Sequence, residues 1–91
     1  MNKKSMALQV EKIGEARNIY RKALTPKQAS ILDFIKMHAK KYGFPPTRAE
    51  IATAFGFASH NGAHEHLVLI ARKGHIRMQH AARGIVLLED A

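Results

Sequence analysis

A chain of 91 residues has room for one domain of ordinary size, and its 46% hydrophobic content is enough to build a modest core. The absence of cysteine excludes disulfides, thiolate catalysis and cysteine-based zinc sites, and no apolar run approaches the roughly 18 residues of a membrane span, so we expect a cytoplasmic protein. Fifteen Lys and Arg against seven Asp and Glu give a formal net charge of +8, which favours a polyanionic partner unless the basic surface serves only solubility.

Residues 1–21 form a basic, moderately apolar leader. Between Met6 and Tyr20, apolar residues recur at spacings of three or four, which is a weak amphipathic-helix pattern that Gly14 interrupts. Three interpretations stay open for this leader: a helix that mediates dimerisation, a basic arm that lies along DNA, or a disordered tail. We expect residues 22–91 to form one domain.

The first clear helix is predicted to begin at Thr25. Thr25 can cap it, Pro26 suits the first helical position, and Gln28 completes a capping box. Two lysines shortly before Gly43 suit the negative end of the helix dipole, and Gly43 can close the helix. The predicted apolar face consists of Ile31, Leu32, Ile35, Met37 and Ala39.

Two further helices are predicted after a proline-rich connector at residues 44–46, which cannot continue the first helix. A second capping box at 47–50 opens a short helix that ends at Gly56. After a two-residue turn, Ser59 can cap a third helix that runs to Lys73. Two helices separated by a tight turn containing glycine are what a helix-turn-helix requires. Their predicted apolar positions are Ile51, Ala52 and Phe55, then Ala63, Leu67, Ile70 and Ala71.

The pattern changes its period after Gly74. Ile76 and Met78 alternate with polar residues, a short basic run follows at 80–83, and residues 84–88 have the composition of a second strand. Three helices followed by a two-stranded hairpin predict a mainly α fold with a small β-hairpin, the winged helix-turn-helix.

The start of the third helix carries the side chains that we expect to read bases, because the first turns of a recognition helix enter the major groove. Asn61 is a natural bidentate reader of adenine, Glu65 can accept from a cytosine amino group, and His64 can donate or accept. Neither Asn61 nor His64 has a core role that would explain it otherwise. The predicted base-reading residues are Ser59, Asn61, Gly62, His64 and Glu65.

Phosphate contacts are predicted around the same helix. Exposed N–H groups at the start of the second helix favour a phosphate near Thr47 and Arg48. Arg77 and Arg83 belong to the hairpin, where they are equally compatible with solvated surface charges. The predicted phosphate-contacting residues are Thr47, Arg48, His60, Lys73, Arg77 and Arg83.

Five of the six histidines lie between residues 60 and 80 and raise the question of a metal site. His60 and His64 are one helical turn apart, but Glu65 points to a different side, so the ligands do not close a tetrahedral site. We therefore expect no metal and no cofactor. Histidines near phosphate are more simply explained as pH-sensitive donors.

Two sequence blocks stand out by their composition and spacing: PPTRAEIA at residues 45–52 and ARKG at residues 71–74. Three shorter blocks accompany them: KALT at 22–25, EHL at 65–67 and RGI at 83–85. Together they resemble the N-terminal DNA-binding domain of the LexA repressor family, over Lys22 to Glu89. The resemblance implies a winged helix that binds an inverted-repeat operator as a dimer, in a repressor of the SOS-response type.

The resemblance also implies that base reading falls on the start of the third helix, at the five positions named above. Two of these positions depart from the family pattern: Gly62 stands where the family has alanine, and His64 where it has glutamate. Because imidazole can donate where a carboxylate only accepts, His64 changes which base edge can be satisfied. The family's usual CTGT half-site therefore does not follow for this chain.

LexA repressors continue into a C-terminal domain with a serine–lysine self-cleavage dyad, for which this sequence offers no match. Ser5, Ser30 and Ser59 have no lysine partner in a recognisable hydrolase context, so we expect no enzymatic activity and no small-molecule substrate. The expected partner is double-stranded DNA, bound by a homodimer. Two alternatives stay open: a protein-interaction module that pairs with a full-length repressor or polymerase through the leader, and a domain taken from a longer protein.

Overall fold

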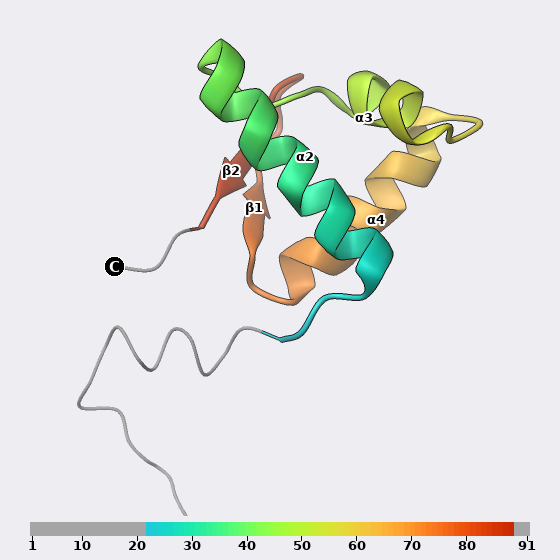
Figure 1. Ribbon diagram of the computed structural model, residues 1–91, viewed down its shortest axis with the longest axis vertical. Helices are drawn as coiled ribbons and strands as arrows, with labels where there is room; N and C mark the ends of the chain where they lie inside the picture. Colours follow the sequence, from blue (N-terminus) through green and yellow to red (C-terminus); the bar gives the residue numbers. More distant parts are fainter. Residues whose placement is uncertain (1–21, 89–91) are drawn as a thin grey trace, which may run out of the picture.

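The computed structural model describes residues 22–88 and has the predicted architecture of three helices and a hairpin (Figure 1). The elements are α2 (Pro26–Tyr42), α3 (Arg48–Phe55), α4 (His60–Arg72), β1 (Ile76–Met78) and β2 (Ile85–Leu87). The mainly α winged-helix prediction is therefore confirmed. The three interpretations of the leader concern residues outside those described.

Both predicted capping boxes are present. At the start of α2, the Thr25 hydroxyl accepts from the backbone N–H of Gln28 at 3.2 Å, and the Gln28 side chain accepts from the backbone N–H of Thr25 at 3.0 Å. At the start of α3, Thr47 and Glu50 make the same two bonds at 3.1 and 2.9 Å. Each box satisfies two N–H groups that a helix start otherwise leaves unpaired, which fixes where the two helices begin.

The cap of α4 differs from the prediction. Ser59 occupies the N-cap position with extended backbone, but its side chain makes no capping hydrogen bond. The N–H that such a cap serves, that of Gly62, donates instead to the backbone carbonyl of Ser59 at 3.2 Å. The Ser59 hydroxyl is thus not engaged by its own helix.

The core gathers the apolar faces of all five elements. Met37 was expected among them and is instead 70% exposed, because two residues along a helix turn it about 200° away from the buried Ile35. The fully buried aliphatic side chains are Ile31, Ile35, Ile51, Leu67, Ile70 and Ile76.

The hairpin is antiparallel, with Ile76 opposite Leu87 and Met78 opposite Ile85. The buried and partly buried side chains of β1 alternate with the exposed Arg77, as its period-2 pattern predicts. Where the chain returns, a Cβ at Gly84 would come within 2.3 Å of the Gln79 carbonyl oxygen, so only glycine fits this tight closure.

The two ends of the described chain meet beside the C-terminal end of α4. The backbone N–H of Lys22 donates to the Lys73 carbonyl at 3.0 Å, and His75 Nε2 lies 2.7 Å from the Lys22 carbonyl oxygen. The backbone N–H of Leu88 donates to the carbonyl of the same His75 at 3.1 Å. In Figure 1 this end of α4 lies near the beginning of α2, whereas the N-terminal end of α4 lies near α3.

Candidate nucleic-acid interface

The turn between α3 and α4 is held by an aromatic stack centred on Phe57. The Phe57 ring is stacked on His66, with centroids 5.0 Å apart, and on Phe55 at 6.1 Å. Phe57 also donates its backbone N–H to the Ala52 carbonyl at 2.9 Å. Because these contacts tie the turn to both helices, they fix the angle at which α4 is presented.

Gly62 is part of this packing. A Cβ at Gly62 would lie 3.4 Å from the Cβ of Phe57, which is ordinary van der Waals contact. The structure therefore places Gly62 against the turn of the motif. From the sequence, Gly62 was expected to face DNA and Phe57 had no assigned role. The contact between Gly62 and Phe57 depends on how α3 and α4 are placed, which the local sequence does not specify.

The starts of α3 and α4 together form a shallow open depression. It is lined by Arg48 from α3 and by His60, Asn61 and His64 from the first turns of α4. Two residues predicted to contact phosphate and two predicted to read bases thus share one concave surface. Among the described residues, no carboxylate lines it.

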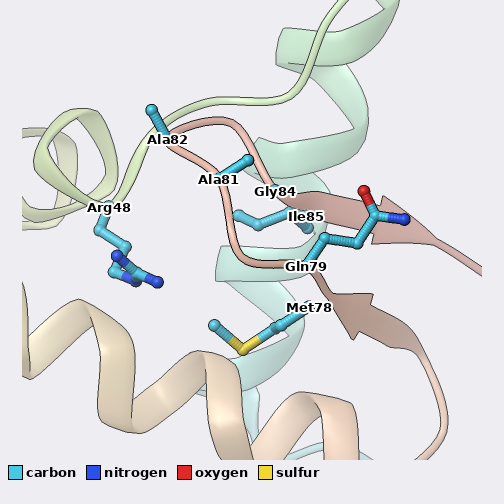
Figure 2. A pocket seen from close by; sticks show the side chains of 7 residues that line it. All are labelled: Arg48, Met78, Gln79, Ala81, Ala82, Gly84 and Ile85. Carbon is cyan, nitrogen blue, oxygen red and sulfur yellow. The ribbon is translucent and has the colours of Figure 1, made fainter.

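Arg48 also borders a second, smaller hollow beneath the wing. Figure 2 shows its side chain reaching from the start of α3 towards Met78, with Ala81, Ala82 and Gly84 of the wing around the hollow. The Nε of Arg48 is buried and has no hydrogen-bond partner within residues 22–88. A buried N–H without an acceptor is costly, so the Nε of Arg48 is an unsatisfied group in the packing under the wing.

The side chain of Glu65 lies next to this surface but is engaged along the helix. Its Oε2 accepts from Asn61 Nδ2 at 3.3 Å, between residues four apart on exposed positions of α4. This bond orients the Asn61 amide and leaves Asn61 with one amide hydrogen and its carbonyl oxygen for an outside partner. Ser59 is exposed at the same end of the helix.

The wing is joined to the start of α3 by Arg83. Its guanidinium donates to both oxygens of Glu50, at 2.8 and 3.0 Å, and to the Pro45 carbonyl at 2.8 Å. It also lies over the Phe44 ring, 4.4 Å from the centroid. The Arg83 hydrogen bonds, followed by the backbone N–H of Thr47, lower the pKa of Glu50 to about 2, and the same pairing raises the pKa of Arg83.

A histidine completes this cluster. His38 Nε2 lies 3.6 Å from Glu50 Oε1, and His38 Nδ1 lies 2.9 Å from the Phe44 carbonyl oxygen. Sequence reasoning recognised Glu50 only as a capping residue and did not consider His38, because their contacts join α2, α3 and the wing. For the Arg83–Glu50 contact, the sequence offered only two signals: a basic residue at the hairpin tip and a carboxylate at a helix start.

The remaining predicted phosphate contacts lie away from the depression. Lys73 ends α4, roughly 20 Å along the helix from His60, and its Nζ donates to Gln28 Oε1 at 2.7 Å. Arg77 is exposed on β1, opposite Val86. The structure therefore brings Arg48 and His60 together with the base-reading residues and leaves Lys73, Arg77 and Arg83 in separate places.

Neither a metal cluster nor a membrane-spanning helix is found in the part of the chain that the structure describes. No three side chains among His, Asp and Glu of residues 22–88 converge on one point that could hold a metal ion. No helix within the same residues is long and apolar enough to cross a bilayer.

Comparison with known proteins agrees with the geometry. Residues 21–84 match the family described as LexA DNA binding domain. The chain is 60% identical over 63 residues to a LexA repressor of Pseudomonas aeruginosa, which is 68% of this chain and 31% of that repressor. It is 54% identical over 70 residues to the LexA repressor of Tolumonas auensis, which is 76% of this chain and 34% of the relative. The chain thus spans about a third of the length of the curated relatives it matches.

Proposed function

The chain belongs to the LexA DNA-binding-domain family, and we propose that it is a sequence-specific transcriptional repressor that places the first turns of α4 in the major groove of double-stranded DNA. The observation that carries this proposal is the depression formed by Arg48, His60, Asn61 and His64. It combines cationic and hydrogen-bonding side chains on the exposed start of a helix, which is the composition that DNA contact requires. The net charge of +8 supports the same partner.

Base reading is assigned to the exposed end of α4. Asn61, oriented by its bond to Glu65, retains the donor and acceptor that pair with adenine N7 and N6. The Ser59 hydroxyl has no bond within its own helix and is available to a base or a phosphate. Gly62 lies against Phe57 within the same turns of α4 and leaves the helix backbone without a side chain on its path to the bases. The proposed base-facing set is Ser59, Asn61, Gly62, His64 and Glu65.

Phosphate contacts are assigned in two groups. Arg48 and His60 line the depression, and Thr47 is the N-cap residue directly before Arg48. These three residues would hold the DNA backbone beside the bases being read. Lys73, Arg77 and Arg83 would reach phosphates farther along the groove. Lys73 donates one of its three N–H groups to Gln28. The bonds from Arg83 to Glu50 and Pro45 leave some of its five N–H groups unused. Both side chains can therefore still donate to a phosphate.

We propose that two copies bind an inverted-repeat operator in the cytoplasm. Lys22 and Leu88, the two ends of the described chain, both lie at the C-terminal end of α4, which is the end away from the depression. No enzymatic activity is proposed for residues 22–88. Ser30 and Ser59 are both exposed, and neither hydroxyl is hydrogen-bonded to a side chain that could remove its proton.

Selection of bound sequences from a random duplex pool tests the proposal. At moderate salt we expect an inverted repeat, whose half-site and spacing define the symmetry of the bound dimer. Asn61→Ala is expected to lose sequence preference while it retains most non-specific affinity, and Ser30→Ala, exposed on α2, serves as the matched control. If the unmodified chain enriches no sequence from the pool, the proposal is overturned.

A further inference from the structure

We propose that His64 reads a guanine in each half-site, by donating an imidazole N–H to the acceptor edge of that base. This inference rests on the proposed function and names the base that one of its residues recognises. It follows from which donors and acceptors remain available at the start of α4.

The depression that His64 lines carries positive charge and, among the described residues, no carboxylate. It is shared with Arg48, His60 and Asn61, and the Asn61 amide oxygen is assigned above to adenine. The neighbouring carboxylate, Glu65, already accepts from Asn61 Nδ2 at 3.3 Å. Arg48 adds a permanent positive charge on the α3 side of the depression. A base edge placed against His64 therefore meets positive charge and an imidazole that can donate.

Among the four bases, guanine matches such a surface best. Its major-groove edge presents two acceptors, N7 and O6, and no donor. Adenine and cytosine each present an amino group, which the cationic Arg48 side chain disfavours, and thymine offers a single acceptor beside a methyl group. A donating imidazole in this setting consequently selects guanine.

The spacing on α4 agrees with a contact of this kind. His60 and His64 are four residues apart and so lie on one face of the helix, both at the depression. His64 is partly buried while Asn61, on the preceding turn, is exposed. His64 is therefore restricted in orientation by its neighbours, whereas a freely solvated histidine would discriminate bases poorly.

Sequence selection with four proteins tests this assignment: the unmodified chain, His64→Ala, His64→Gln and the control His80→Ala, which removes an exposed histidine of the wing. We expect one guanine per half-site for the unmodified chain and for His80→Ala. That preference should disappear in His64→Ala, with the other positions unchanged, and persist in part in His64→Gln, which retains an N–H donor. Circular dichroism confirms that each variant is folded.

Modified operators then probe the contact itself. Replacing the selected guanine by 7-deazaguanine removes N7, and replacing it by 2-aminopurine removes O6. We expect one of the two to weaken binding of the unmodified chain about 5- to 30-fold and to leave His64→Ala binding unchanged. Equal losses in both proteins, or a half-site whose guanine does not depend on His64, would overturn this inference alone. A pool that yields no preference at all would instead overturn the proposed function.

Discussion

Arg83 and Glu50, 33 residues apart in the chain, form a bidentate ion pair: Arg83 Nη1 lies 2.8 Å from Glu50 Oε1, and Arg83 Nη2 lies 3.0 Å from Glu50 Oε2. The same carboxylate accepts from the backbone N–H of Thr47 at 2.9 Å, so it closes the capping box of α3 as well. One side chain thus fixes both the start of α3 and the tip of the wing. Because Arg48 follows Thr47 directly, this junction also positions a residue of the proposed interface.

Separate substitutions should distinguish the two bonds of Glu50. Glu50→Ala removes the ion pair and the side-chain half of the capping box, while the Thr47 hydroxyl can still accept from the backbone N–H of residue 50. Arg83→Ala removes only the ion pair, and Glu50→Gln retains an acceptor for the Thr47 N–H. We therefore expect the urea midpoint of unfolding to fall most for Glu50→Ala and less for the other two variants. Equal midpoints for Glu50→Ala and Arg83→Ala would mean that the bond from the Thr47 N–H to the Glu50 side chain contributes nothing to stability.

The lowered pKa of Glu50 predicts that the protein becomes less stable to unfolding as the pH falls. Its ordinary value of 4.5 falls to about 2 in the folded protein, so the folded state favours the ionised form. The resulting stabilisation is fully present above pH 4.5 and is lost as the pH falls from 4.5 through 2. Urea unfolding between pH 7 and pH 2 should show a smaller decline for Glu50→Gln than for the unmodified chain. Parallel curves for the two proteins would contradict the pairing.

Local signals in the sequence were sufficient for the elements and their starts. The capping residues at Thr25 and Thr47 depend on groups three residues away, and both boxes are present as predicted. The same holds for the period-2 pattern of β1. Met37 was wrongly assigned to the core because its apolar character was given more weight than its angular position on α2.

Contacts between distant residues were beyond what periodicity and spacing can specify. Lys73 and Gln28 are 45 residues apart, and nothing in either local pattern pairs the ammonium with a buried amide. The predicted site residues were chosen by chemistry and by their place at a helix start, which is why four side chains of the depression were anticipated while the stack of Phe57 on His66 was not. Their roles on DNA stay predictions.

Two glycine substitutions beside the same turn should have opposite effects. At Gly62, inside α4, an added methyl group meets Phe57 at an ordinary distance of 3.4 Å, so Gly62→Ala is expected to stabilise the fold by about 0.5–1 kcal/mol through the helix preference of alanine. At Gly56 the backbone is left-handed, with φ of 72°, and Gly56→Ala should destabilise by about 1 kcal/mol or more. Thermal unfolding measures both, and destabilisation by Gly62→Ala would show that the turn cannot accommodate the methyl group.

Two leucines of α4 provide a matched test of the core. Leu67 is fully buried, and Leu67→Ala is expected to cost about 2–5 kcal/mol through lost packing and a cavity. Leu69 is 42% exposed, so Leu69→Ala should change stability by only about 0.5 kcal/mol. Similar losses for the two variants, measured by urea unfolding, would place the buried face of α4 elsewhere.

Replacing Arg48 should weaken DNA binding without lowering the stability of the fold. Its Nε is buried without an acceptor, so Arg48→Met removes an unsatisfied donor and keeps much of the apolar stem, and we expect no loss of thermal stability. Because the same guanidinium lines the depression, the variant should bind duplex DNA more weakly, with the slope of log affinity against log salt reduced by about 1. Lys36→Ala, exposed on α2, controls for the loss of one positive charge from the surface. An unchanged slope in Arg48→Met would show that the arginine serves the packing of the wing, because a phosphate contact cannot be removed without releasing fewer counterions.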